Sequence, residues 1–153
     1  MSVDDYSFGI EKFSDILWES HRLYKEHHDE LFGEHVKFQP DVPRYYQFES
    51  LDCLAVFTIR DVYNRLVGYS YYILMKNHNN LADIVADNTL FFITNSHRKG
   101  WLASKFIRYC ETKLFENGFT EVRMHSKSRT PFDILLKRSK YKEEEVVYIK
   151  KKE

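Results

Sequence analysis

The chain has 153 residues, 43% of them apolar, and its 23 basic side chains balance 23 acidic ones. This length is typical of one domain with its own core, so we expect a single domain over residues 1–153. The balance of charge argues against specific nucleic-acid binding, because the chain has no net positive field to gather phosphates.

Apolar residues at three- and four-residue steps predict an amphipathic helix, Phe13–Leu31, as the first element. Prolines break this pattern in Phe38–Pro43, and we expect a short helix after them, through Tyr45–Phe48. Two β-rich runs follow, Leu54–Ile59 and Leu66–Met75, separated by polar, turn-like residues. Two such runs so close together predict an antiparallel hairpin.

A third β-rich run covers Thr89–Thr94, after the polar stretch His78–Asn80. The chain then becomes polar and cationic, and a helix is predicted from about Trp101 to Asn117, ending before Gly118. The alternating segment Phe119–His125 predicts the next strand. A strand, helix and strand in this order imply a parallel pair with a right-handed crossover.

The last predicted elements are a short helix and a strand. Thr130, Pro131 and Asp133 are residue types that favour a helix start, through capping, a fixed φ and a favourable charge. The β-rich run Val146–Ile149 predicts the final strand. Antiparallel and parallel pairing together indicate a mixed sheet, so the fold class is α/β or α+β.

The cysteines, the apolar runs and the first residues bear on the cellular compartment of the protein. Cys53 and Cys110 lie in different predicted elements, as free thiols of a reducing cytosol would. No apolar run approaches the ~20 residues of a membrane helix, and the acidic start MSVDDYSFG has no signal-peptide core. We therefore expect a cytoplasmic protein without a membrane partner. His21 and His27-His28 share no metal spacing with a third ligand, so we expect no metal.

The loop before the third helix carries the functional prediction. A helix N-terminus offers free N–H groups and partial positive charge, which makes it an anion site. Gly100 lets a phosphate approach the backbone, and Arg98 and Lys99 can neutralise a pyrophosphate. From the loop alone, an ordinary helix start with two solvated cations is an equal alternative.

The segment His97–Leu102 resembles the Arg/Gln-x-x-Gly-x-Gly/Ala loop with which GNAT acetyltransferases wrap the CoA pyrophosphate. Gly100 matches the central glycine, whereas His97 and Leu102 depart from the pattern, and Ala103 can replace the last small residue. Order and spacing over nearly the whole chain are similar to a GNAT subgroup common in bacteriophages and prophages. The matching features are Phe13–Leu31, Leu66-Val67-Gly68-Tyr69, Asp87–Phe92, Ser96–Gly100, Glu111, Leu114, Gly118, His125-Ser126-Lys127 and Tyr141.

The resemblance implies a mostly antiparallel sheet with a splayed parallel strand pair and flanking helices. It also implies an acyltransferase that moves an acetyl group from acetyl-CoA, its co-substrate, to an amine of a small molecule or protein. The strand before the loop would pair with pantetheine through Phe91, Phe92 and Ile93. The pyrophosphate would lie against His97, Arg98, Lys99, Gly100, Trp101, Leu102 and Ala103.

The catalytic prediction is more open. The resemblance places Leu136 where the family has a tyrosine general acid. Acetyl transfer needs a neutral amine, and therefore a base, for which Asp87 and His125 are candidates. A histidine titrates near neutrality, which suits this role. Each candidate also has a purely structural interpretation, as a carboxylate or a histidine at the end of a strand.

Two other functions remain open. Leu136 favours a non-catalytic GNAT-fold protein that binds and modulates a partner, such as a phage protein acting on a host factor, whereas Gly100 and the cations favour the enzyme. A generic nucleotide-phosphate domain is disfavoured because the chain has neither a GxxxxGK[ST] nor a GxGxxG motif. We expect acceptor contacts from the first two helices and from a loop Lys76–Val85. Both a monomer and a homodimer are compatible with the sequence.

Overall fold

The computed structural model describes residues 2–77, 80–127 and 129–153. Five strands form one sheet in the order β1-β2-β3-β4-β5. Neighbouring strands are antiparallel except β4 and β5, which are parallel. This confirms the predicted mixed, mostly antiparallel sheet. The strands are β1 (Ser7–Ile10), β2 (Leu54–Arg60), β3 (Leu66–Asn77), β4 (Asn80–Ile93) and β5 (Glu121–Arg123).

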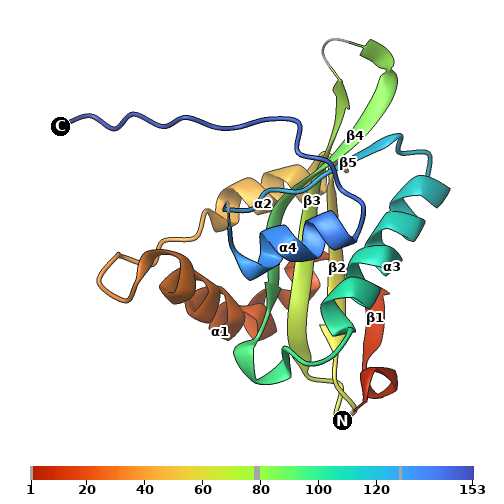
Figure 1. The fold of residues 1–153 in the computed structure, drawn as a ribbon. Helices are drawn as coiled ribbons and strands as arrows, with labels where there is room; N and C mark the ends of the chain where they lie inside the picture. Colours follow the sequence, from red (N-terminus) through yellow and green to blue (C-terminus); the bar gives the residue numbers. More distant parts are fainter. Residues whose placement is uncertain (1, 78–79, 128) are drawn as a thin grey trace.

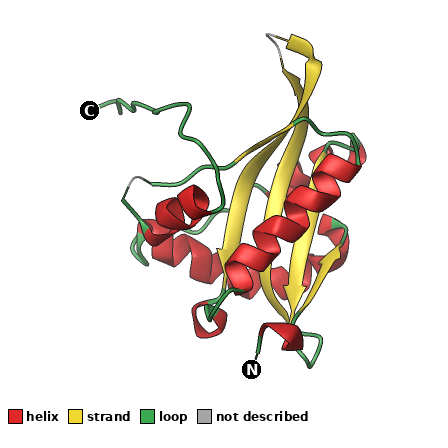
Figure 2. Cartoon of the chain, turned by 45° about the vertical axis from the view of Figure 1, so that its right-hand side comes forward, coloured by secondary structure: helices red, strands yellow, loops and turns green. Residues whose placement is uncertain are grey.

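Helices cover both faces of the sheet (Figure 1). α1 (Phe13–Phe32) and α2 (Val42–Ser50) pack on one face, and α3 (Leu102–Glu116) crosses the other, as Figure 2 shows. The short α4 (Pro131–Arg138) lies beside β4, where the Phe132 ring stacks on Phe91 with centroids 4.9 Å apart. Two single turns of 3-10 helix, η1 (Val3–Asp5) and η2 (Asn95–His97), complete the list of elements.

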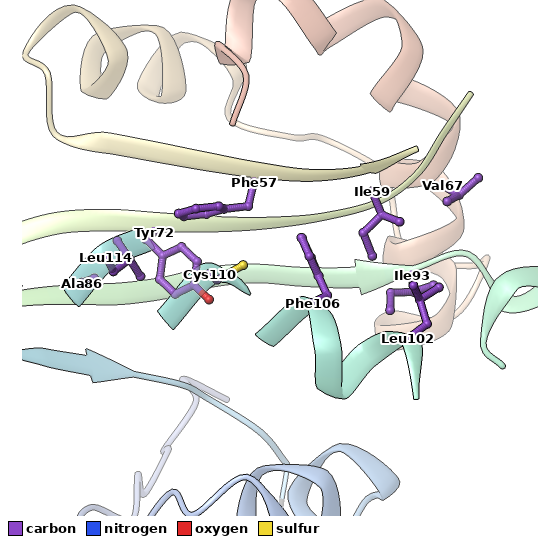
Figure 3. Packing of buried hydrophobic residues seen from close by; sticks show 10 residues of the cluster. All are labelled: Phe57, Ile59, Val67, Tyr72, Ala86, Ile93, Leu102, Phe106, Cys110 and Leu114. Atoms are coloured by element: carbon purple, nitrogen blue, oxygen red, sulfur yellow. The ribbon is translucent and has the colours of Figure 1, made fainter. Parts of the chain in front are cut away.

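Each face of the sheet has its own core. The face under α3 is mostly aliphatic, with side chains from β2, β3, β4 and one stripe of α3 meeting in Figure 3. These residues are Phe57, Ile59, Val67, Tyr72, Ala86, Ile93, Leu102, Phe106, Cys110 and Leu114. The face under α1 is richer in aromatics, including Phe13, Tyr24, Tyr69, Tyr71 and Phe92. Burying so much ring area makes both faces rigid platforms for the strand ends.

The helix ends follow the sequence signals. The Thr130 hydroxyl accepts the Asp133 N–H at 3.3 Å, so α4 begins where the Thr-Pro-x-Asp pattern predicts. α3 ends at Glu116 with Asn117 as its C-cap, and Gly118 then adopts a φ of 92°, which a glycine tolerates without strain. No helix among the described residues is long and apolar enough to cross a bilayer.

Three predictions about the elements are wrong. The strand β1 precedes α1 and was not predicted. The segment Lys76–Val85 is not a loop, because its described residues extend β3 and β4 into a projecting hairpin. Of the polar stretch between these strands, His78 and Asn79 lie outside the described residues. Finally, Val146–Ile149 forms no strand, since it has no ladder partner and lies exposed.

Candidate active site

The two parallel strands share only a short ladder and then separate. β5 pairs with β4 from Val85 to Asp87, and β4 then continues alone on that side to Ile93. The Thr94 N–H donates to Val67 of β3 at 2.9 Å. The backbone N–H and C=O groups of successive residues point to alternate sides of a strand. Those of Thr94 face β3, so the N–H and C=O groups of Phe91 and Ile93 point away from β3. Their amides therefore face the gap left by β5.

A β-bulge in β4 marks the point of separation. Leu90 pairs with Tyr71 and Asn88 with Tyr72, which leaves Thr89 as the extra residue. The buried Asn88 amide nitrogen lies 3.0 Å from Leu90 O and 3.1 Å from Tyr71 O. The same nitrogen is 3.0 Å from Ser70 Oγ. Asn88 thus fastens the bulge, a role that sequence analysis missed because Asn-Thr has no strand-specific signal.

The predicted phosphate loop ends in a set of free amides. Gly100 has a φ of 54°, in the left-handed region that favours glycine. Trp101, at the N-cap of α3, makes no capping bond with its side chain. Among the described residues, the N–H groups of Gly100, Trp101, Ala103 and Ser104 donate to no acceptor. Such amides at a helix N-terminus form an anion site.

The loop cations have different roles. Arg98 donates to both carboxylate oxygens of Glu30, at 3.0 and 2.6 Å, and to Ile93 O at 2.7 Å. It therefore joins the loop to α1 and occupies one backbone acceptor of β4. Lys99 is exposed and forms no ion pair within the described parts of the chain. Of these two cations, Lys99 is the one left for an anion at the helix.

Two further contacts hold the loop in place. Glu26, one turn before Glu30 on α1, accepts the Thr94 hydroxyl at 2.7 Å and the Asn95 N–H at 3.0 Å. On the other side, the Tyr6 hydroxyl and His97 Nδ1 are 2.8 Å apart. His97 is therefore anchored to the segment before β1. The side chain of Leu102 is buried in the α3 core with 1% exposed, so only its backbone can meet a ligand.

The two predicted base candidates are in direct contact. His125 Nε2 lies 2.6 Å from Asp87 Oδ1 across the separating strands. The carboxylate accepts the Nε2–H and so places the lone pair of the neutral ring on Nδ1. The side chain of His125 is 62% exposed and that of Asp87 25% exposed. An oriented, accessible imidazole of this kind can accept a proton from a bound amine.

A cavity of about 390 Å³ opens on the face covered by α1 and α2. Its inner lining is aromatic and aliphatic, including Tyr24, His27, Phe38, Tyr45, Tyr69 and Leu90. His27 stacks on Phe92 with ring centroids 4.7 Å apart, and its Nδ1 is 2.8 Å from the Tyr69 hydroxyl. Burial lowers the pKa of His27 to about 4, so this ring is neutral near pH 7.

Strand register places the Asp87–His125 pair next to this cavity. Asp87 pairs with Ile73, and Leu90 pairs with Tyr71. Ile73 and Tyr71 are two residues apart on β3, so they point to the same face of the sheet, and so do their partners. Two residues of a strand span roughly 7 Å. The carboxylate of Asp87 and the Leu90 wall of the cavity are therefore near neighbours on one face.

The position of the expected tyrosine is apolar in the structure as well. Leu136 is 6% exposed on α4 and has no proton to donate. Tyr141 follows Lys140, whose φ of 68° lies in the left-handed region. The assignment of Leu136 to the tyrosine position stays a prediction from the resemblance. Within the described ranges, no three His, Cys, Asp or Glu side chains are grouped so as to hold a metal ion.

The chain matches no family model and no curated protein sequence. Solved structures do resemble it. An aminoglycoside acetyltransferase from an uncultured soil metagenomic sample superposes with a TM-score of 0.75 at 16% identity, over 97% of each chain. Ribosomal-protein-alanine N-acetyltransferase from Brucella melitensis gives a TM-score of 0.73 at 15% identity, over 97% of this chain and 99% of that one.

A third structure is a predicted acetyltransferase from Clostridium acetobutylicum with acetyl-CoA. It superposes with a TM-score of 0.70 at 10% identity, over 95% of this chain and 96% of that one. All three similarities extend over nearly the full length of both chains. The fold of this chain is therefore that of GNAT acetyltransferases.

Proposed function

We propose that this protein transfers an acetyl group from acetyl-CoA to a primary amine. The observation that carries the proposal is the Asp87–His125 pair at the point where β4 and β5 separate. We propose that the acetyl group lies at this point, as the resemblance to GNAT enzymes implies. A base and an anion site at opposite ends of one strand gap suit a ligand with a reactive end and a phosphate end.

Acetyl-CoA supplies the activated acetyl group as a thioester. We assign its pyrophosphate to the amides of Gly100, Trp101, Ala103 and Ser104, with Lys99 nearby for charge. The amides of Phe91 and Ile93 in the gap suit pairing with pantetheine, although Arg98 already uses the Ile93 carbonyl. His97, Arg98 and Leu102 then hold the loop in shape, while the amides bind.

His125 is the proposed catalytic base and Asp87 its positioning residue. An alkylamine of pKa about 10.4 is almost wholly protonated at neutral pH and cannot attack a thioester in that form. His125 Nδ1 accepts one proton from the ammonium, and the lone pair this frees on the nitrogen forms a bond to the acetyl carbon. The carbon–sulfur bond then breaks with its electron pair going to sulfur, and the second proton that the nitrogen loses passes to solvent. The thiolate leaves without the help of Leu136, because a thiolate with a pKa near 8.5 is already a good leaving group.

The cavity favours an acceptor with an apolar body. Its rings and aliphatic side chains suit an aromatic or branched aliphatic group, with the amine directed towards Asp87. A polycationic sugar, the substrate class named for the soil acetyltransferase, would have to bury charges against these rings. We therefore propose hydrophobic primary amines as the substrate class.

A thiol-release assay tests this function. Purified protein with acetyl-CoA is offered four acceptor classes in parallel: arylalkylamines, branched alkylamines, aminoglycosides and peptides with free N-termini. We expect CoA release with the first two classes. Preferred turnover of aminoglycosides or peptides would overturn the acceptor class. Binding of acetyl-CoA without acetylation of any class would overturn the enzymatic proposal.

That last outcome would favour the non-catalytic alternative, a GNAT-fold protein that binds and modulates a partner protein. The loss of the tyrosine at Leu136 is the observation behind this alternative. Membership of the bacteriophage subgroup and a cytoplasmic location stay predictions from the sequence.

A further inference from the structure

The C-terminal segment, residues 143–152, leaves the body of the protein and runs into solvent (Figure 1). It contains four consecutive large apolar residues, among them Val147 at 73%, Tyr148 at 91% and Ile149 at 78% exposure. A run of β-branched and aromatic residues has high strand propensity. Left unpaired, such a run is an aggregation hazard, so its exposure calls for a partner.

The charges on either side of this run are arranged with opposite signs. Three glutamates, Glu143–Glu145, precede the apolar residues, and three lysines, Lys150–Lys152, follow them. In a parallel pair of two such segments, glutamates would face glutamates and lysines would face lysines. In an antiparallel pair, the acidic end of each segment faces the basic end of the other copy. The segment is therefore complementary to itself in one orientation only.

Symmetry restricts the register of such a pair. Two identical antiparallel strands are related by a two-fold axis perpendicular to the sheet. Directly opposed residues point to the same face, so one residue at the axis must lie opposite its own copy. An axis at Val147 places Val146 opposite Tyr148 of the second copy. The same register sets Glu143 opposite Lys151 and Glu144 opposite Lys150. Val146–Tyr148 pairs then lie at the centre, Glu145 faces Ile149, and two ion pairs lie at each end.

The sheet offers a place for these strands to continue. β5 has β4 on one side, and no strand of the described chain pairs with its other edge. Hydrogen bonding to Glu121 raises the pKa of Arg123 on β5, and the charge of Glu145, at the start of the segment, adds to this rise. Two strands alone are marginal in water, whereas pairing along an existing sheet edge is not.

We propose that residues 143–152 are a dimerisation strand that pairs antiparallel with the same segment of a second copy of this chain. The interface is isologous, with Val146, Val147, Tyr148 and Ile149 at its centre and the two charge triplets at its ends. Dimerisation covers the exposed apolar run and leaves the Asp87–His125 pair in its own subunit.

Charge reversal tests the pairing in the full-length chain. Sedimentation velocity at low ionic strength is expected to give twice the 18.5 kDa chain mass for the wild type. The variant E143K/E144K/E145K and the variant K150E/K151E/K152E should each sediment as monomers, because like charges then face each other. Carrying both sets of changes in one chain restores the complementarity, so this variant should be a dimer again.

Mixing the two triple variants tests the antiparallel pairing most directly. An equimolar mixture of the two triple variants, one of them carrying an affinity tag, should form a heterodimer that the tag retains. The helical signal in circular dichroism is expected to be unchanged in every variant, because all six side chains are exposed and lie outside the helices. A monomeric wild type, triple variants that remain dimeric, or a mixture that fails to associate would each overturn the proposal.

Discussion

His125 Nε2 lies 2.6 Å from Asp87 Oδ1, which joins the strand before the phosphate loop to the chain that follows β5. Two base candidates chosen independently from the sequence thus become one unit, in which the carboxylate orients the ring. If they act as a unit, their removal should not be additive.

We expect His125→Ala to lower kcat/KM by about 10²–10⁴-fold. Asp87→Asn should give a smaller loss, since it misorients the ring without removing it. The double variant should be no slower than His125→Ala alone. Glu121→Gln is the matched control, because this neighbouring carboxylate binds Arg123 and should be dispensable. Multiplicative losses in the double variant would contradict a single unit.

Acid should weaken the fold through His27. Burial lowers its pKa to about 4 from the ordinary 6.5, so between these values the unfolded chain binds a proton that the folded chain does not. The contribution of His27 to the free energy of unfolding is therefore fully present above pH 6.5. It falls by about 2–3 kcal/mol as the pH drops to about 4. In urea unfolding at each pH, His27→Gln should show a shallower decline than wild type. Parallel curves for the two proteins would refute the assignment.

The bulge in β4 should depend on Asn88. Asn88→Ala removes the donor that bridges Tyr71 O and Leu90 O, which should cost about 1–3 kcal/mol. Thr89→Ala, at the exposed bulge residue, should change stability by less than about 0.5 kcal/mol. Thermal unfolding of the two variants measures the difference. Equal melting temperatures would show that Asn88 does not fasten the bulge.

Two buried tyrosines should respond differently to loss of their hydroxyl. Burial raises the pKa of Tyr141 and the nearby Glu111 adds to this rise, but Tyr141 Oη has no hydrogen-bond partner of normal geometry among the described residues, so Tyr141→Phe should change stability by less than about 1 kcal/mol. Tyr69→Phe, which breaks the bond to His27, should lower it by about 1 kcal/mol. A marked destabilisation by Tyr141→Phe would mean that this hydroxyl has a partner.

Local sequence signals predicted the elements that local physics determines. The periodicity of α1, the Thr-Pro start of α4 and the β2–β3 hairpin all follow from nearby residues. β1 was missed because four residues at a sheet edge give little pattern of their own. Val146–Ile149 was wrongly predicted as a strand from its β-rich residues. β-Propensity reflects a fit to neighbouring strands, and in the single chain this segment has no such neighbour.

The candidate site divides in the same way. The glycine loop and the base candidates Asp87 and His125 came from residue types together with the GNAT resemblance, and their roles stay predictions. The clamp from Glu26 and Glu30 to the loop could not, because it joins residues almost 70 positions apart whose pairing depends on how α1 crosses the sheet. The cavity likewise forms only when α1, α2, β3 and β4 come together.

Binding of acetyl-CoA tests the central claim most directly. Titration calorimetry of the wild type should show saturable binding at one site per chain. Gly100→Glu should abolish it, because bulk, negative charge and a φ of 54° all oppose the ligand or the loop there, while circular dichroism reports an intact fold. A wild type that gives neither heat nor a thermal shift with acetyl-CoA would contradict the account.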